Sequence, residues 1–257
     1  MSERNREGKR TARERLAAER AKQRSAEKRR RTLIVGAGVV CVLGLAAVIG
    51  VVAANVGKDK GDASGPLITP SGATGKDGLA IPVGKESARS TLVVWEDFRC
   101  PACKSFEDTY RSTIHELAAA GRLKVEYHLA TLIDGNMGGS GSRRAANAAA
   151  CAQDAGKFVP YHDVLFENQP PETDDAFAKD AKLKALARKV DGLTGPAFDT
   201  CVDEGRHNAW VAKSSEAFLK GGFRGTPAVF LNGKDLFADR GMTPEKFKEM
   251  VETANPA

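Results

Sequence analysis

The sequence predicts an α/β domain whose β-sheet is divided by a helical insertion and which is preceded by one transmembrane helix. Three observations support this fold class. A short apolar run at residues 92–95 leads into a Cys-X-X-Cys motif and a helical pattern. Residues 135–222 then show helical periodicity, and strand-forming residues return only near residue 225. Strands and helices that follow one another in this way are typical of α/β domains.

The first 57 residues combine a basic tail with an apolar span. Residues 1–31 contain thirteen Lys or Arg against five Glu, whereas the rest of the chain carries 26 basic and 28 acidic residues. Residues 32–57 contain no charged residue, and a helix of that length can cross a bilayer core. Because basic clusters before a span stay cytoplasmic, we expect a cytoplasmic tail, a retained single-pass anchor and an extracytoplasmic domain. A cleavable signal peptide is the alternative.

Residues 58–79 are predicted to form a flexible linker, because they contain five glycines and two prolines and little apolar content. The folded domain is expected over residues 80–257. It begins with an edge strand near residues 80–83, where Pro82 cannot donate to a neighbouring strand.

The Cys-X-X-Cys motif is predicted to join a buried strand to a helix. The strand prediction rests on Leu-Val-Val-Trp at residues 92–95. Pro101 suits the first helical turn, so Cys100 falls at the helix N-terminus and Cys103 one turn inside. Free N–H groups and the helix dipole favour an anion there, which predicts a reactive Cys100 thiolate and a resolving Cys103 thiol. A zinc knuckle is the alternative, but the remaining Cys and His residues lack its compact spacing.

The chain beyond this helix alternates between strand and helix signals. Residues 123–129 alternate apolar and polar side chains and predict a second strand, parallel to the first. The insertion is expected to contain helices near residues 142–155, 159–168, 174–190, 196–204 and 208–220. A hairpin over residues 225–238, with its turn at Asn232-Gly233, and a last helix over residues 243–251 complete the domain.

Cys151 and Cys201 fall in two helices of the predicted insertion. In an oxidising compartment they are expected to form a structural disulfide, worth roughly 4 kcal/mol in the chain-entropy model. Two buried free thiols and a second redox-active pair are the alternatives. Cys41, within the apolar span, is expected to be a small apolar residue.

Residues 81–251 resemble the DsbA-like thiol-disulfide oxidoreductases of the thioredoxin fold, especially the membrane-anchored actinobacterial type. The resemblance is carried by Trp-Glu-Asp-Phe-Arg-Cys-Pro-Ala-Cys at residues 95–103, by the helical insertion, and by Gly-Thr-Pro at residues 225–227. It implies a cis bond between Thr226 and Pro227 beside the cysteines, with the Thr226 backbone holding a substrate peptide. It also implies that Pro101 and Ala102, between the cysteines, tune the redox potential and face the substrate.

Two further acids are candidates for a proton relay to Cys103. Many thioredoxin-fold proteins carry a buried acid six residues before the first cysteine, but that position is Val94 here. Glu96 or Asp97 could replace it if turned inward. The four histidines have no common spacing, and structural roles are expected for them.

The sequence as a whole predicts an extracytoplasmic enzyme that donates its Cys100–Cys103 disulfide to secreted or cell-envelope proteins. The resemblance implies a quinone-coupled membrane reoxidant of the DsbB or vitamin K epoxide reductase type. No cofactor, metal or nucleic-acid partner is expected. A disulfide reductase or isomerase is the nearest alternative, and a metal or peptide-binding chaperone is the alternative from another class.

Overall fold

The computed structural model describes residues 65–254. The predicted tail and membrane span, over residues 1–57, lie outside the described residues, as does Cys41. Within residues 65–254, no helix combines the length and the apolar character needed to cross a bilayer.

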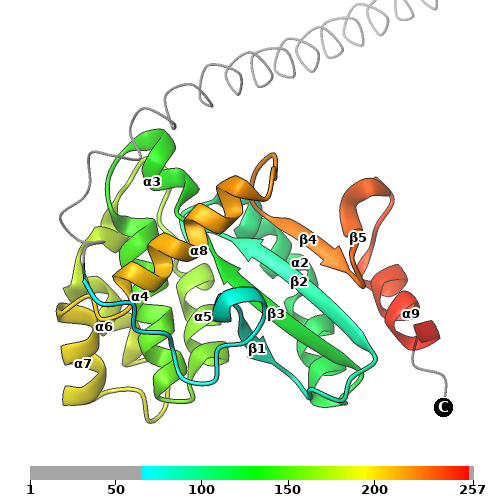
Figure 1. Ribbon diagram of the computed structural model, residues 1–257, viewed down its shortest axis with the longest axis horizontal. Helices are drawn as coiled ribbons and strands as arrows, with labels where there is room; N and C mark the ends of the chain where they lie inside the picture. The colour runs from blue at the N-terminus through cyan, green and yellow to red at the C-terminus, as the bar shows by residue number, and fades with distance from the viewer. Residues whose placement is uncertain (1–64, 255–257) are drawn as a thin grey trace, which may run out of the picture. The chain divides into compact units, whose positions relative to one another are not determined.

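A five-stranded mixed sheet forms the centre of the domain (Figure 1). Its strands lie in the order β1-β3-β2-β4-β5, and only the β2–β3 pair is parallel. The parallel pair confirms the predicted strand-helix-strand unit, whose crossover is helix α2 (Pro101–Ala119). The strands are β1 (Ile81–Val83), β2 (Ser90–Glu96), β3 (Leu123–Leu129), β4 (Ala228–Leu231) and β5 (Lys234–Asp235).

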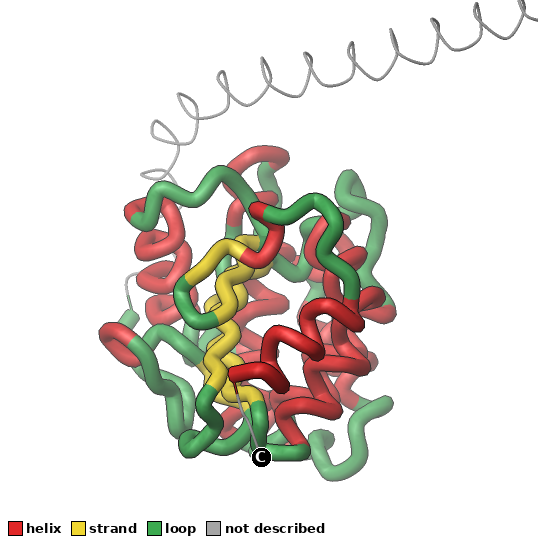
Figure 2. The backbone as a smooth tube through the Cα atoms, turned by 90° about the vertical axis from the view of Figure 1, so that its right-hand side faces the viewer, coloured by secondary structure: helices red, strands yellow, loops and turns green. Residues whose placement is uncertain are grey.

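Helices cover both faces of the sheet (Figure 2). Helices α2 and α9 pack against each other, while α8 contacts β3. The helices of the insertion, α4 to α7, gather beside the sheet (Figure 1). The helices beyond α2 are α3 (Leu132–Met137), α4 (Gly141–Asp154), α5 (Phe158–Glu167), α6 (Asp180–Ala187), α7 (Pro196–Asp203), α8 (Asn208–Lys220) and α9 (Pro244–Ala254).

Two local predictions are wrong, and one short helix was not predicted. The single helix expected over residues 174–190 is a 3-10 turn, Ala176–Ala178, followed by the shorter α6, because Lys179 adopts an extended conformation and Phe177 turns into the core. The helix that was not predicted is α3, which starts at Leu132, ahead of the helices expected from residue 142 onward. Residues Leu236–Ala238 form a 3-10 turn, since the Asp235 side chain accepts a hydrogen bond from the Phe237 N–H and caps the turn.

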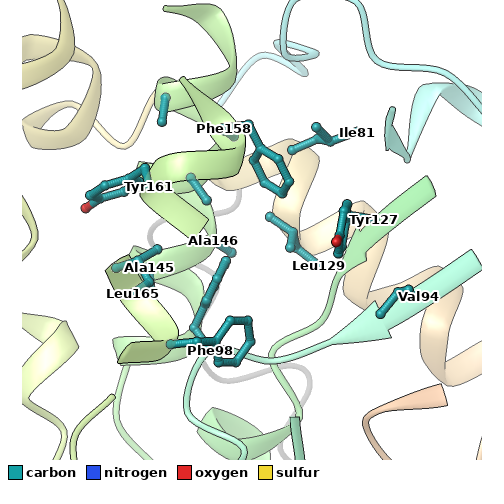
Figure 3. Packing of buried hydrophobic residues seen from close by; sticks show 14 of the residues in the cluster. Ile81, Val94, Phe98, Tyr127, Leu129, Ala145, Ala146, Phe158, Tyr161 and Leu165 are labelled. Atoms are coloured by element: carbon teal, nitrogen blue, oxygen red, sulfur yellow. The ribbon is translucent and has the colours of Figure 1, made fainter. Parts of the chain in front are cut away.

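One continuous core joins the sheet to the insertion. Figure 3 shows Val94, Tyr127 and Leu129 of the strands facing side chains from α4 and α5. The ring of Phe158 in α5 packs against the ring of Tyr127 in a tilted arrangement, with ring centroids 5.5 Å apart. Because the same cluster includes Cys100 and Cys103, the insertion and the motif share one packed interior.

The described part of the predicted linker differs from a flexible tether. Residues 68–79 are held against α4 and α8 by hydrogen bonds from side chains to their backbone oxygens, including Trp210 Nε1 to the Gly78 oxygen at 2.7 Å and Gln153 Nε2 to the Ser71 oxygen at 2.8 Å. His207 contacts the Ile68 oxygen at 2.8 Å. Residues 68–79 are therefore part of the folded domain and not a free tether.

Candidate active site

Cys100 and Cys103 lie where the sequence predicts them, at the start of α2. Cys100 is the N-cap residue, in an extended conformation, and Pro101 is the first helical residue. Both thiols are free, with residues 6% and 0% exposed. The preceding turn is held by Gln169, whose Nε2 donates to the carbonyl oxygens of Phe98 and Cys100 at 2.9 and 3.0 Å. A residue of the insertion thus fixes the backbone beside the first cysteine.

The two thiols differ sharply in acidity. A hydrogen bond from Cys103 lowers the pKa of Cys100 to about 6; burial opposes the shift, while the N–H groups of Cys103 and Ala102 add to it. Burial raises the pKa of Cys103 well above its usual value, and the charge of Glu96 raises it further. At neutral pH Cys100 is therefore a thiolate and Cys103 a thiol.

The segment before β4 closes over Cys100. The Thr226–Pro227 bond is cis, and the Thr226 carbonyl oxygen lies 3.2 Å from Cys100 Sγ. Thr226 and Pro227 are half-buried, whereas Pro101 and Ala102 are exposed on the first turn of α2. The structure therefore brings together the two cysteines and all four residues that the sequence assigned to substrate contact.

A buried arginine next to Cys100 ties the motif to the insertion. Arg99 is 2% exposed, and its guanidinium donates to Asp134 Oδ1 at 2.7 Å and to the Gly138 oxygen at 2.9 Å. It also pairs with Asp175 Oδ1 at 3.0 Å. Asp134 in turn accepts from the N–H of Ser142 at the start of α4. Sequence reasoning missed this network, because its acids lie 35 and 76 residues further along the chain.

The two relay candidates, Glu96 and Asp97, are both fully buried. Asp97 Oδ2 accepts from the Ile133 N–H at 2.9 Å, and its Oδ1 accepts from the Arg99 N–H at 2.8 Å. Burial raises the pKa of Asp97 to about 7. Proton transfer by either acid to Cys103 stays a prediction.

His162 of α5 contacts Glu96 inside the core. Its Nε2 lies 2.5 Å from Glu96 Oε1, and Glu107 of α2 is buried beside the pair. Burial disfavours the charged imidazole, but the charges of Glu96 and Glu107 outweigh it and raise the pKa of His162. Burial likewise raises the pKa of Glu107. No sequence signal marks this cluster, since its residues come from three separate elements.

Cys151 of α4 and Cys201 of α7 form the disulfide that the sequence favours, with their Cα atoms 5.9 Å apart. The bond lies within the insertion, and its sulfurs are therefore not part of the Cys100–Cys103 pair.

Comparisons with known proteins agree with this geometry. Residues 76–253 match the family model described as thioredoxin. The chain is 28% identical over 175 residues to disulfide bond formation protein D of Bacillus subtilis, covering 66% of this chain and 74% of that protein. Among solved structures, reduced DsbA from Mycobacterium tuberculosis superposes with a TM-score of 0.60 at 25% identity, covering 70% of this chain and 93% of that one. Reduced DsbG from the same organism gives a TM-score of 0.61 at 26% identity, covering 72% and 90%.

Proposed function

Since this chain belongs to the thioredoxin family and is a thiol-disulfide oxidoreductase of the DsbA-like type, we propose that it donates its Cys100–Cys103 disulfide to secreted or cell-envelope proteins. The observation that carries the proposal is the acidity difference between the two thiols. A Cys100 thiolate stabilised at a helix N-terminus favours the reduced form of the pair, which makes the disulfide a good oxidant.

The proposed reaction consists of two exchanges. A substrate thiolate attacks Cys100 Sγ, the Cys100–Cys103 bond breaks, and the electron pair leaves on Cys103, which takes up a proton. The second substrate thiolate then attacks the substrate sulfur of the mixed disulfide and expels Cys100 as a thiolate. The substrate is oxidised by two electrons and the enzyme is reduced by two. The low pKa of Cys100 makes it the better leaving group in the second exchange.

Substrate recognition is proposed to use the backbone of Thr226. Its segment lies against Cys100, and an extended peptide bound there would bring its cysteine to the Cys100 sulfur. Pro101 and Ala102, in the first turn of α2, offer exposed apolar surface next to Cys100 in the chain. Neither residue carries a charge, so the surface beside Cys100 is expected to accept peptides of varied sequence.

The enzyme is proposed to work outside the cytoplasm, anchored by residues 32–57. Support comes from the basic cluster that precedes this apolar run. The Cys151–Cys201 disulfide adds support, because such bonds persist in oxidising compartments. After each turnover the reduced pair needs an oxidant, and a quinone-coupled membrane protein would serve by accepting two electrons, while Cys103 gives up its proton as the disulfide forms again.

The experiment that tests the direction of electron flow is the reduction potential of the Cys100–Cys103 pair, measured in glutathione buffers. A potential well above the thioredoxin value of about −270 mV is expected, together with oxidation of a reduced, unfolded test protein. The Cys100→Ala variant provides the matched control and should lose the oxidation. A potential at or below that of thioredoxin would instead assign the protein to the reductases.

A further inference from the structure

Three side chains with metal-ligating atoms converge in the core behind the active site. Glu96 ends strand β2, Glu107 lies one turn beyond Cys103 in α2, and His162 comes from α5 of the insertion. They are 0%, 0% and 1% exposed. One carboxylate oxygen of each glutamate and one ring nitrogen of the histidine all lie within 4.8 Å of one another.

The cluster contains more acceptors than the described residues satisfy. Both carboxylate oxygens of Glu107 and Oε2 of Glu96 are buried without a hydrogen-bond partner. Arg111, a cation whose charge acts on Glu107, directs its guanidinium to Glu167 and Asp108 instead. Buried carboxylate oxygens are costly when unpartnered, and they are normally paired or bound to a metal.

We propose that Glu96, Glu107 and His162 form a binding site for a divalent cation of the zinc type. An imidazole nitrogen and two carboxylates form a donor set that zinc accepts, and its double positive charge offsets the two negative charges. Asp163 Oδ1, 3.5 Å from His162 Nδ1, lies on the side of the ring where an outer carboxylate commonly orients a ligating histidine.

The observed spacing is compatible with such a site after a small shift. Zinc bonds to nitrogen and oxygen of about 2.0–2.2 Å place ligand atoms roughly 3–4 Å apart. His162 Nε2 and Glu96 Oε1 are now 2.5 Å apart, so the cation would take the place of the proton that they share. Glu107 would need only to turn its carboxylate toward the other two ligand atoms, which lie no more than 4.8 Å from one of its oxygens.

The site would connect the three elements on which the cysteines rest, namely the strand before them, the helix that carries them and the insertion. Its ligand atoms are nitrogen and oxygen, whereas a site formed by Cys100 and Cys103 would bind the metal through sulfur. A second cluster, Cys151, Cys201 and His207, offers no comparable donor set, because its two sulfurs are bonded to each other.

Zinc retention by the full chain tests the proposal. The protein is kept oxidised, so that Cys100 and Cys103 are unavailable as ligands, and is refolded in detergent with Zn²⁺ because the site is buried. After dialysis, about one zinc per chain is expected by elemental analysis. E107Q should weaken binding by more than the roughly 10–100-fold that loss of an outer partner costs. The matched control D108N changes the exposed neighbour and should retain zinc as the wild type does.

Three results would overturn the site. These are wild-type protein that retains no zinc, equal retention by wild type and E107Q, and X-ray absorption spectra that show sulfur bound to the zinc. If E107Q does not fold, the absorption spectrum of the wild-type protein and its melting temperature with and without Zn²⁺ decide the matter. Nitrogen and oxygen ligands with a raised melting temperature support the site, and an unchanged melting temperature contradicts it.

Discussion

The pH dependence of the reduction potential should reveal the acidity of Cys100 directly. Reduction of the disulfide takes up two electrons and, when both thiols are protonated, two protons, so the potential falls by about 59 mV per pH unit. Once Cys100 is a thiolate only one proton is taken up, and the slope halves to about 30 mV per unit. The break is expected near pH 6, where the pKa of Cys100 lies. No second break is expected below pH 9, because the pKa of Cys103 is raised.

The size of the effect follows from the shift in the Cys100 pKa from 9.0 to about 6. A lowered pKa stabilises the reduced protein above the shifted pKa, and this contribution is lost as the pH falls through 6. At pH 7 it amounts to about 1.4 kcal/mol, which raises the potential by about 30 mV over that of an ordinary thiol. Above pH 9 it reaches about 4 kcal/mol.

The assay equilibrates the protein with glutathione buffers at half-unit steps between pH 5 and pH 8.5 and counts free thiols by alkylation. The rate of Cys100 alkylation over the same range provides an independent titration and should reach half its plateau near pH 6. A single slope of about 59 mV per unit across the whole range would refute the reasoning, since it would mean that Cys100 stays protonated.

Three other substitutions have outcomes that the structure defines. Cys103→Ala removes the main hydrogen bond to the Cys100 thiolate, so the half-point of Cys100 alkylation should move from about pH 6 toward 9, without reaching it because the helix N–H groups remain. Replacing Cys151 and Cys201 together by Ala should lower the free energy of unfolding by about 4 kcal/mol in denaturant titrations and leave the potential unchanged. Arg99→Met should cost about 2–3 kcal/mol in the same titrations, because it removes the hydrogen bonds of a buried guanidinium to the half-buried carboxylates of Asp134 and Asp175.

Each of these has its own control. Cys103→Ser keeps a hydroxyl donor and should shift the alkylation profile less than Cys103→Ala does. A change in potential on loss of the Cys151–Cys201 bond would show that the insertion disulfide takes part in electron transfer. Arg111→Met removes a more exposed arginine and should cost about 1 kcal/mol or less; an equal cost for the two arginines would contradict the importance assigned to burial.

The sequence predicted best where neighbouring residues determine the structure. Pro101 after Cys100, and apolar residues at helical spacing, were sufficient to place the motif at the start of α2. The helix expected over residues 174–190 failed because burial of Phe177 overrides local helix propensity there. The composition of residues 65–79 predicts a linker. Only the contacts of this segment with α4 and α8 show that it is part of the domain.

The residues of the candidate site likewise differ in how well the sequence predicts them. Cys100 and Cys103 are recognisable from four consecutive residues, whereas Glu96 gives no sign in the sequence that it points inward. Its partner His162 is 66 residues away, and the pair is brought together by the packing of the insertion against the sheet. Arg99 could likewise be taken for a surface residue, until Asp134 and Asp175 surround it.

The attachment of residues 68–79 to helices α4 and α8 also bears on the anchoring proposed above. Twelve residues in extended conformation would span about 40 Å, and that length is lost when the segment lies along the domain surface. An anchored enzyme would therefore hold its cysteines closer to the bilayer than a free segment would allow.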